Sequence, residues 1–362
     1  MSRSYREQAE AFAALHDGGD ATQLADNLHA RIHVLRGGGL PVPAMVAAVG
    51  RGNAWVCSPR TTYADYAAEE ARRLLPPWQA RPLSMLCAGV GRLLDAARID
   101  RAVSLNNWGL STNLYPALDQ LDLAGLIDEA RTGWPDHALW FRSLNPVHDA
   151  DWLTALRARG FLLVASRQVY LREAGLPACG RDLVADLRLL QRQDLRHVAE
   201  TAFVETDYPR IAALYAQLYL DKYSRHNPAY HATMLRDWHR RGLLQLRGFR
   251  DDDGQLLCIA GMFGTGTTMT TPIVGYDTSR PQRLGLYRTL TACGFDEALR
   301  SGRHLNLSAG AAGFKRLRGA TPAIEYSAVW LPPAARASRA VVSLLSSLTC
   351  RLGVPLMRKY QL

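Results

Sequence analysis

The sequence predicts an α/β protein built from mixed sheets, and three observations lead to this fold class. Residues 244–276 contain three short runs of strand formers in hairpin order, followed by a helix and a further strand. Strands and helices also alternate through the first half of the chain. At 362 residues, the chain exceeds one ordinary compact domain. We therefore expect two domains, residues 1–175 and 176–332, and a C-terminal tail of residues 333–362.

The bulk composition is that of a folded soluble protein, with 48% hydrophobic and 21% charged residues. The net charge of +10 favours polyanionic partners such as nucleic acid, phosphate-rich cofactors, nucleotide sugars or anionic membranes. Arginine supplies nearly all of this charge and suits phosphate recognition, although a GC-rich genome would produce the same excess.

The six cysteines lie far apart, without a CxxC pair or a cysteine–histidine cluster. This spacing argues against a metal site and against a disulfide scaffold, so we expect reduced thiols. The N-terminus lacks an apolar signal core, and no apolar stretch approaches the roughly 18 residues of a membrane-spanning helix. The expected location is therefore the cytoplasm, with no metal and no permanently bound cofactor.

In the first half, glycines and prolines divide the chain into elements. Gly37-Gly38-Gly39 precedes the first strand, Pro76-Pro77 ends a helix, and Gly160 ends another. The expected elements are a helical segment over 1–35, strands over 44–50 and 53–58, a helix over 63–75, α/β elements over 96–105, 114–126 and 138–144, a helix over 149–159, and a strand over 161–171. This half contains no nucleotide-binding fingerprint.

The second half begins after a linker that contains proline and glycine, at residues 175–182. The acidic turn Asp251-Asp252-Asp253-Gly254 between two strand-forming runs is a strong hairpin signal. The expected elements are helices over 182–202, 208–221 and 231–241, strands over 244–250, 256–263 and 267–276, a helix from 285 to about 300, a strand over 305–308, a short basic element over 314–320, and a last strand that carries Glu325.

A candidate anion site lies where the helix near residue 285 begins. Helix starts have amide N–H groups without intrahelical acceptors, and Gln282, Arg283 and Gly285 stand there. Tyr287 follows in the first turn, where it would protonate a leaving thiolate or ribose oxygen. The alternative is an ordinary helix cap beside a packed tyrosine.

A second candidate site is the polar loop that ends the helix over 208–221. Asp221, Lys222, Tyr223 and Asn227 bring several hydrogen-bonding groups together there. We expect this loop to bind substrate, with Asp221 as the general base and Tyr223 as a second catalytic group. A purely structural hydrogen-bond network is the alternative.

Basic residues around two glycines form a third candidate site after the strand over 305–308. Ser308, Lys315 and Arg316 would bind a carboxylate or phosphate of the acceptor, and Glu325 would accept a proton through water. The alternative is a solvated basic turn. In the first half, the polar segment 106–113 would line a cleft between the domains, or form a hydrogen-bonded loop.

The second half resembles the GNAT superfamily, specifically the Fem-like or BioF2-like branch with two GNAT-type domains in tandem. The resemblance covers residues 180–330. It depends on the three-strand meander, on Gln282-x-x-Gly285 before a helix, on the strand over 305–308, and on Phe314-Lys315-x-x-x-Gly319-Ala320. It implies two tandem GNAT-like domains, the first a degenerate copy and the second catalytic. Lys315 matches a lysine that relatives hold near the reaction centre.

The resemblance implies an N-acyltransferase that moves an activated acyl group, with acyl-CoA as co-substrate, onto a small-molecule amine by direct attack. The sequence has no nucleophile elbow, P-loop, HExxH motif or dinucleotide fingerprint. Direct attack needs only positioning and stabilisation of the tetrahedral oxygen, which backbone N–H groups supply. The phosphate loop departs from the CoA-binding pattern at its third marked position, where Tyr287 stands.

Two other functions fit the same residues. One is an aminoacyl-tRNA dependent transferase of the Fem type, although the long coiled-coil insertion that many Fem proteins use for tRNA is absent. The other is a non-catalytic binding protein that keeps the fold. The basic, apolar tail of residues 333–362 would either contact a membrane surface or pack as a C-terminal helix. DNA is not an expected partner.

Overall fold

The computed structural model describes residues 3–178, 180–191 and 194–361. Its strands are β1 (Ala30–Leu35), β2 (Val42–Ala47), β3 (Ala102–Leu105), β4 (Ala138–Leu144), β5 (Leu162–Arg172), β6 (Arg196–Val198), β7 (Gln245–Arg250), β8 (Leu256–Thr265), β9 (Thr268–Tyr276), β10 (His304–Asn306) and β11 (Thr321–Trp330). Its helices are α1 (Tyr5–His16), α2 (Ala67–Leu74), α3 (Pro77–Ala96), α4 (Leu123–Gly133), α5 (Ala150–Ala158), α6 (Arg181–Leu189), α7 (Asp207–Ala216), α8 (Ala232–Arg240), α9 (Leu286–Ser301), α10 (Ala312–Arg316), α11 (Arg336–Leu348) and α12 (Val354–Tyr360).

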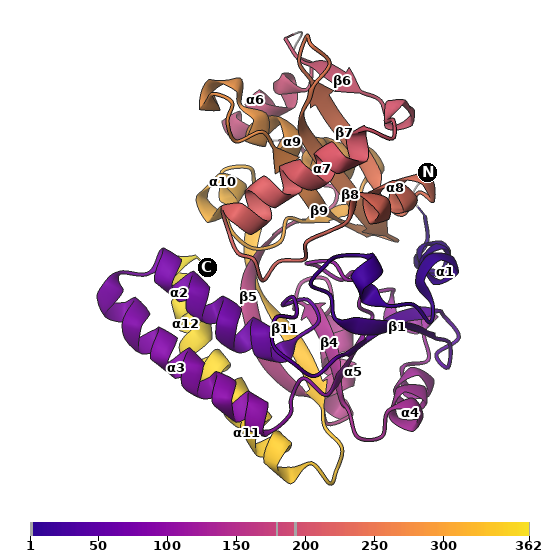
Figure 1. Cartoon of the computed structure of the whole chain (residues 1–362), viewed down its shortest axis with the longest axis vertical. Coiled ribbons are helices and arrows are strands. Elements are labelled where there is room, and N and C mark those ends of the chain that lie inside the picture. The colour runs from indigo at the N-terminus through magenta and orange to yellow at the C-terminus, as the bar shows by residue number, and fades with distance from the viewer. Residues whose placement is uncertain (1–2, 179, 192–193, 362) are drawn as a thin grey trace.

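All eleven strands of the described residues form one mixed sheet, in the order β1-β2-β3-β4-β11-β5-β10-β9-β8-β7-β6. The β3–β4 and β9–β10 pairs are parallel. β11, the last strand of the chain, lies between β4 and β5, while β5 reaches across to β10. These two long strands therefore join the strands of the first half of the chain to those of the second half (Figure 1). The division of the chain near residue 175 stays a prediction, and the sheet continues across it.

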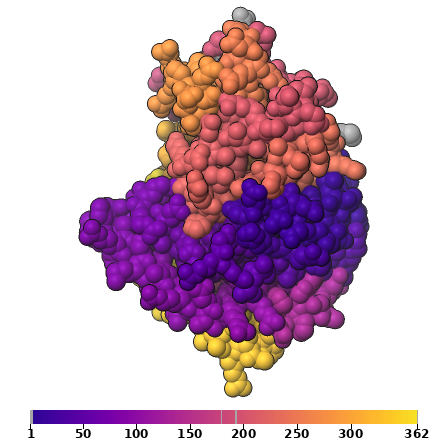
Figure 2. All heavy atoms as spheres, in the orientation of Figure 1, coloured from indigo at the N-terminus to yellow at the C-terminus, as the bar shows by residue number. Residues whose placement is uncertain are grey.

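Aromatic side chains fix the two halves against each other. Across the halves, Phe12 meets Trp238 edge to face at 5.8 Å between ring centroids, and Trp108 lies tilted against Phe263 at 5.1 Å. Within the first half, Phe12 and Trp108 also meet edge to face at 5.4 Å. All four side chains are fully buried. Such contacts add specific geometry to the burial of large apolar area, so we expect the halves to move as one body. Figure 2 shows the second half of the chain packed directly on the first half.

One helix prediction and one strand prediction in the first half were wrong. The segment over 1–35 is not helical throughout, because residues 30–35 (ARIHVL) alternate apolar and polar side chains and pair with β2 as β1. Residues 53–58 are a loop and not a strand. Asn53 fixes this loop by accepting from the amide of His29 and donating to its carbonyl.

The predicted helix over 63–75 does end before Pro76, but a helix that was not predicted follows it, and the helix predicted over 182–202 was too long. Pro77 does more than end a helix, because it is the first residue of α3, where its missing N–H is harmless. The predicted helix over 182–202 ends at Leu189, and β6 follows it. Residues 192 and 193 of that segment lie outside the described residues, as does Cys179 of the predicted linker.

The C-terminal segment is helical and packs on the sheet. α11 and α12 are joined by a π turn (Thr349–Gly353), and they contact β5 and α3. Among the described residues, one helix (Arg336–Tyr360) is long and apolar enough to cross a membrane. Its buried side chains are Val342, Leu345, Val354 and Met357. In Figure 1 these yellow helices lie beside the purple α2–α3 hairpin.

Candidate active site between the two halves

A cavity opens where the parallel strands β9 and β10 separate. The two strands pair only over Thr268 to Thr270 and His304 to Asn306. Beyond this point a cavity of about 120 Å³ lies between their carboxyl ends, lined by Thr271 and Val274 on one side and by residues 307–311 on the other. Ligands of open α/β sheets bind outside the carboxyl ends of strands, so this position is that of a substrate site.

The loop 308–311 has an unusual backbone. Ser308, Gly310 and Ala311 have φ angles of 59°, 77° and 49°. Left-handed backbone at non-glycine residues costs of the order of 1–3 kcal/mol and is concentrated at functional sites. The amide N–H groups of residues 309–311 have no acceptor among the described residues. The loop therefore offers donors for a carbonyl oxygen or an oxyanion.

Lys315 supports this loop from beneath. Its buried Nζ donates to the carbonyls of Leu307, Ser308 and Ala309 at 2.7, 3.1 and 2.7 Å. Burial lowers the pKa of Lys315 to about 7, but three carbonyl acceptors match the three protons of the charged amine. A neutral amine has one proton too few for these three acceptors, so the charged form of Lys315 fits the loop. Lys315 lines the cavity, and its amine holds the loop in place.

We expect Lys315→Met to reduce the free energy of unfolding by about 2 kcal/mol, because buried carbonyls lose their donor. Urea denaturation followed by circular dichroism measures this change. Arg316→Met is the matched control, because Arg316 is exposed beside it and should cost little. Equal stability of the two variants would show that the amine does not hold the loop.

An ion pair between β5 and β11 forms the floor of the site. Nε of Arg167 donates to Oε1 of Glu325 at 2.8 Å, and Nη2 donates to Oε2 at 3.2 Å. The same guanidinium donates to Oγ of Ser308 and to the carbonyl of Ser111, at 3.1 and 2.6 Å. Its Cζ lies 4.8 Å from the centre of the Trp55 ring. Arg167 therefore ties the loop to both halves.

Glu70 brings a carboxylate into the cavity from α2. Its side chain is 30% exposed, because it opens into the cavity, and it lies 3.7 Å from the guanidinium of Arg73. Burial raises the pKa of Glu70 above its ordinary value of 4.5, while Arg73 and Arg167 oppose that rise. A carboxylate with a raised pKa, in a cavity with oxyanion donors, has the properties of a general base.

Several of the predicted site residues meet in this cavity, namely Tyr223, Asn227, Tyr287, Ser308 and Lys315. Burial raises the pKa of Tyr287, so its phenol stays protonated at neutral pH. The side-chain amide of Asn227 is fully engaged: Nδ2 donates to two carbonyls and Oδ1 accepts from Trp55 Nε1. Its visible role is to join the loop to the first half.

The other predicted residues lie elsewhere. Asp221, Lys222, Gln282, Arg283 and Arg316 are exposed, and none of them lines the cavity. Gly285 begins α9 with a φ of 64°. Glu325 is buried beneath the cavity as the partner of Arg167. The functional roles of all these residues stay predictions.

Sequence reasoning missed the contribution of the first half, which supplies Trp55, Tyr66, Glu70, Arg73 and Arg167 to the cavity. Arg167 could have been found, because it interrupts the apolar run of β5 (LLVASRQVYLR). Glu70 had no such signal, since it stands in a helix rich in charged residues. The expectation that the segment 106–113 lines a cleft agrees with the place of Ser111 in the cavity wall.

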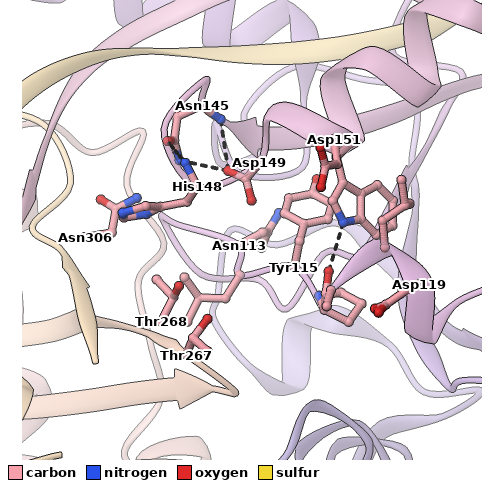
Figure 3. A pocket seen from close by; sticks show the side chains of 15 residues that line it. Asn113, Tyr115, Asp119, Asn145, His148, Asp149, Asp151, Thr267, Thr268 and Asn306 are labelled. Atoms are coloured by element: carbon pink, nitrogen blue, oxygen red, sulfur yellow. Dashed lines mark hydrogen bonds between the residues drawn. The ribbon is translucent and has the colours of Figure 1, made fainter. Parts of the chain in front are cut away.

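A second, polar cavity of about 370 Å³ also lies between the halves (Figure 3). Asp119, Asp149 and Asp151 line it, and none of the lysines and arginines that the structure describes does. Burial raises the pKa of Asp149 to about 7, and burial beside His304 lowers that of His148 to about 4. The lining suits a neutral or cationic polar molecule better than an anionic one. Of the predicted site residues that the structure describes, Asn113 of the segment 106–113 lines this cavity, and the residues of the three candidate sites in the second half do not.

Comparison with known proteins places the fold. No family model and no curated protein matches the chain. The structure of L-PGS from Bacillus licheniformis is 10% identical, with a TM-score of 0.52 over 95% of this chain and 98% of that one. FemX is 10% identical, with a TM-score of 0.49 over 91% and 97%. A tandem GNAT protein from the clavulanic acid biosynthesis pathway is 12% identical, with a TM-score of 0.35 over 63% and 75%.

The described strands and the helices around them form a mixed α/β fold. The predicted mixed α/β fold class is confirmed. The likeness to L-PGS extends over nearly the whole chain, and at this identity it is a likeness of fold.

Proposed function

We propose that the protein is an N-acyltransferase of the tandem, Fem-like kind that transfers an acyl group from acyl-CoA to an amine. The observation that carries this proposal is the loop 308–311, which lines the same cavity as Glu70 and whose N–H groups at residues 309–311 have no acceptor in the described part of the chain. Direct attack of an amine on a carbonyl needs a base for the amine proton and donors for the developing oxyanion. It needs no covalent intermediate.

In this mechanism Glu70 takes a proton from the amine, and the amine nitrogen attacks the thioester carbonyl carbon. The N–H groups of residues 309–311 stabilise the oxygen of the tetrahedral intermediate. The C–S bond then breaks, and the phenol of Tyr287 protonates the CoA thiolate. Tyr287 regains its proton from Glu70 through water.

The start of α9 is the proposed site for the CoA phosphates. Its first-turn N–H groups have no intrahelical acceptors, and the exposed Arg283 adds positive charge. Tyr287 in the first turn and Leu290 in the next line the cavity. Phosphates at the helix start would therefore extend the arm of the cofactor towards the loop 308–311.

We expect CoA and acetyl-CoA to bind with micromolar affinity, and Arg283→Glu to weaken that binding about tenfold, equivalent to about 1.4 kcal/mol. Titration calorimetry measures both. Arg300→Glu is the matched control: it makes the same charge change at an exposed position at the other end of α9. A protein that ignores millimolar CoA would rule out this donor.

The net charge of +10 favours a second candidate, in which a charged tRNA supplies an aminoacyl group to the same amine site. Transfer of radiolabelled amino acid from charged tRNA, with no affinity for CoA, would select this function. Failure of both donors, with unchanged cellular activity of Glu70→Gln, would indicate a binding protein.

A further inference from the structure

An apolar groove continues from the active-site cavity. It has a volume of about 440 Å³, within the range of ligand sites, and Glu70 and Arg167 line both the groove and the cavity. The groove runs between the α2–α3 hairpin and the C-terminal helices, which lie side by side in Figure 1. Its apolar lining includes Ala67, Ala71, Leu83, Leu86, Val90, Leu345, Leu348, Leu352 and Met357.

The charges of the groove are unevenly placed. Glu70 and Arg167 stand at its junction with the cavity, and Arg351 is the other charged residue in its lining. Two of its leucines, Leu86 and Leu352, remain 41% and 52% exposed. Apolar surface that gathers along a channel and stays open to solvent marks an interaction site, and ligand-binding grooves are one kind of such site.

The order of groups along the two cavities identifies that ligand. The first turns of α9 line the active-site cavity at one side, and Glu70 and Arg167 line it where the groove begins. A CoA thioester with its phosphates at α9 would hold its carbonyl near the loop 308–311. Any hydrocarbon beyond that carbonyl would then enter the groove.

We propose that the groove holds the hydrocarbon chain of a long-chain acyl-CoA, so that the protein selects its donor by chain length. This inference rests on the proposed function and names its donor class. Burial of each methylene should tighten binding about two- to fourfold until the groove is filled. A chain carried by the amine is the competing source, and the experiment separates the two.

The test compares the affinities of acetyl-, octanoyl- and palmitoyl-CoA by calorimetry, below the concentration at which the long ester forms micelles. We expect palmitoyl-CoA to bind at least a hundredfold more tightly than acetyl-CoA. Ala67→Phe fills the groove beside its junction and should remove this advantage while leaving acetyl-CoA binding unchanged. Leu93→Phe is the control, because Leu93 is exposed on α3 and does not line the groove.

Should Ala67→Phe fail to fold, Leu352→Arg at the exposed rim should weaken palmitoyl-CoA selectively. Equal affinity for all three esters would overturn the chain inference and leave the acyltransferase proposal standing. No affinity for any CoA ester would overturn both. If Ala67→Phe instead weakens dodecylamine but not palmitoyl-CoA, the groove belongs to the acceptor, and the donor assignment is wrong.

Discussion

Replacement of Glu70 by glutamine should lower kcat/KM for acyl transfer about a hundredfold or more, because general base catalysis contributes at least that factor. Glutamine keeps the size and hydrogen bonding of the side chain but cannot take the amine proton. Burial raises the pKa of Glu70 above its ordinary value of 4.5, so the wild-type rate should rise with pH as Glu70 ionises through that raised pKa. The variant should lack this rise in its pH–rate profile. Release of CoA thiol measures both profiles.

The control for this experiment is Glu69→Gln. Glu69 stands next in the chain, accepts a hydrogen bond from Ser224 at 2.7 Å, and does not line the active-site cavity. Its loss should change kcat/KM less than threefold. If Glu70→Gln retains the wild-type rate and pH profile, Glu70 is not the base.

Stability supplies an independent readout of the same residue. Burial raises the pKa of Glu70 in the folded state, so Glu70 ionises at a lower pH in the unfolded chain than in the folded protein. The folded protein is therefore destabilised by this group as pH rises above 4.5. Glu70→Gln should be at least as stable as wild type at pH 7, which separates a lost base from a damaged fold.

Loss of the carboxylate beneath the site should have the largest effect on stability. Glu325→Leu leaves the guanidinium of Arg167 without its buried partner, and breaking such a pair costs about 3–5 kcal/mol. The side chains of Arg167 and Glu325 are 14% and 2% exposed, so little water reaches the place of the lost carboxylate. Urea denaturation gives the change in the free energy of unfolding.

The double variant Arg167→Met/Glu325→Leu tests the origin of that cost. Removing both charges should recover most of the stability, because no unpaired charge remains buried. Activity should not return, since the contact from Arg167 to Ser308 is gone as well. If the double variant is as unstable as Glu325→Leu, packing and not the unpaired charge accounts for the loss.

Local chemistry explains which elements the sequence predicts correctly. The turn at residues 251–254 and the short runs of strand formers around it locate β7, β8 and β9, because a hairpin is determined by residues close in the chain. Turn chemistry could not show that β11 pairs with β4 and β5. Tyr326 lies opposite Leu144 and Ala165, and partners so distant in sequence leave no local signal.

The site divides in the same way. The polar loop after α7 and the segment around Ser308 are visible as clusters, and Tyr223, Tyr287, Ser308 and Lys315 do line one cavity. Asp221 belongs to the same cluster but is exposed at the end of the π turn (Gln217–Asp221), because position along a helix decides which side chains face inward. Glu70 enters the cavity only through the packing of the first half against the second.

The position of β11 has a consequence for biosynthesis. β4 and β5 flank β11, so neither finds its full set of backbone partners until the ribosome has released residue 330. A nascent chain that stops near residue 175 would leave β4 with one open edge and β5 with neither of its two neighbours, β11 and β10, and unpaired strand edges invite aggregation. The first half should therefore be insoluble when it is expressed alone, and it should need protection during synthesis until the last strand arrives.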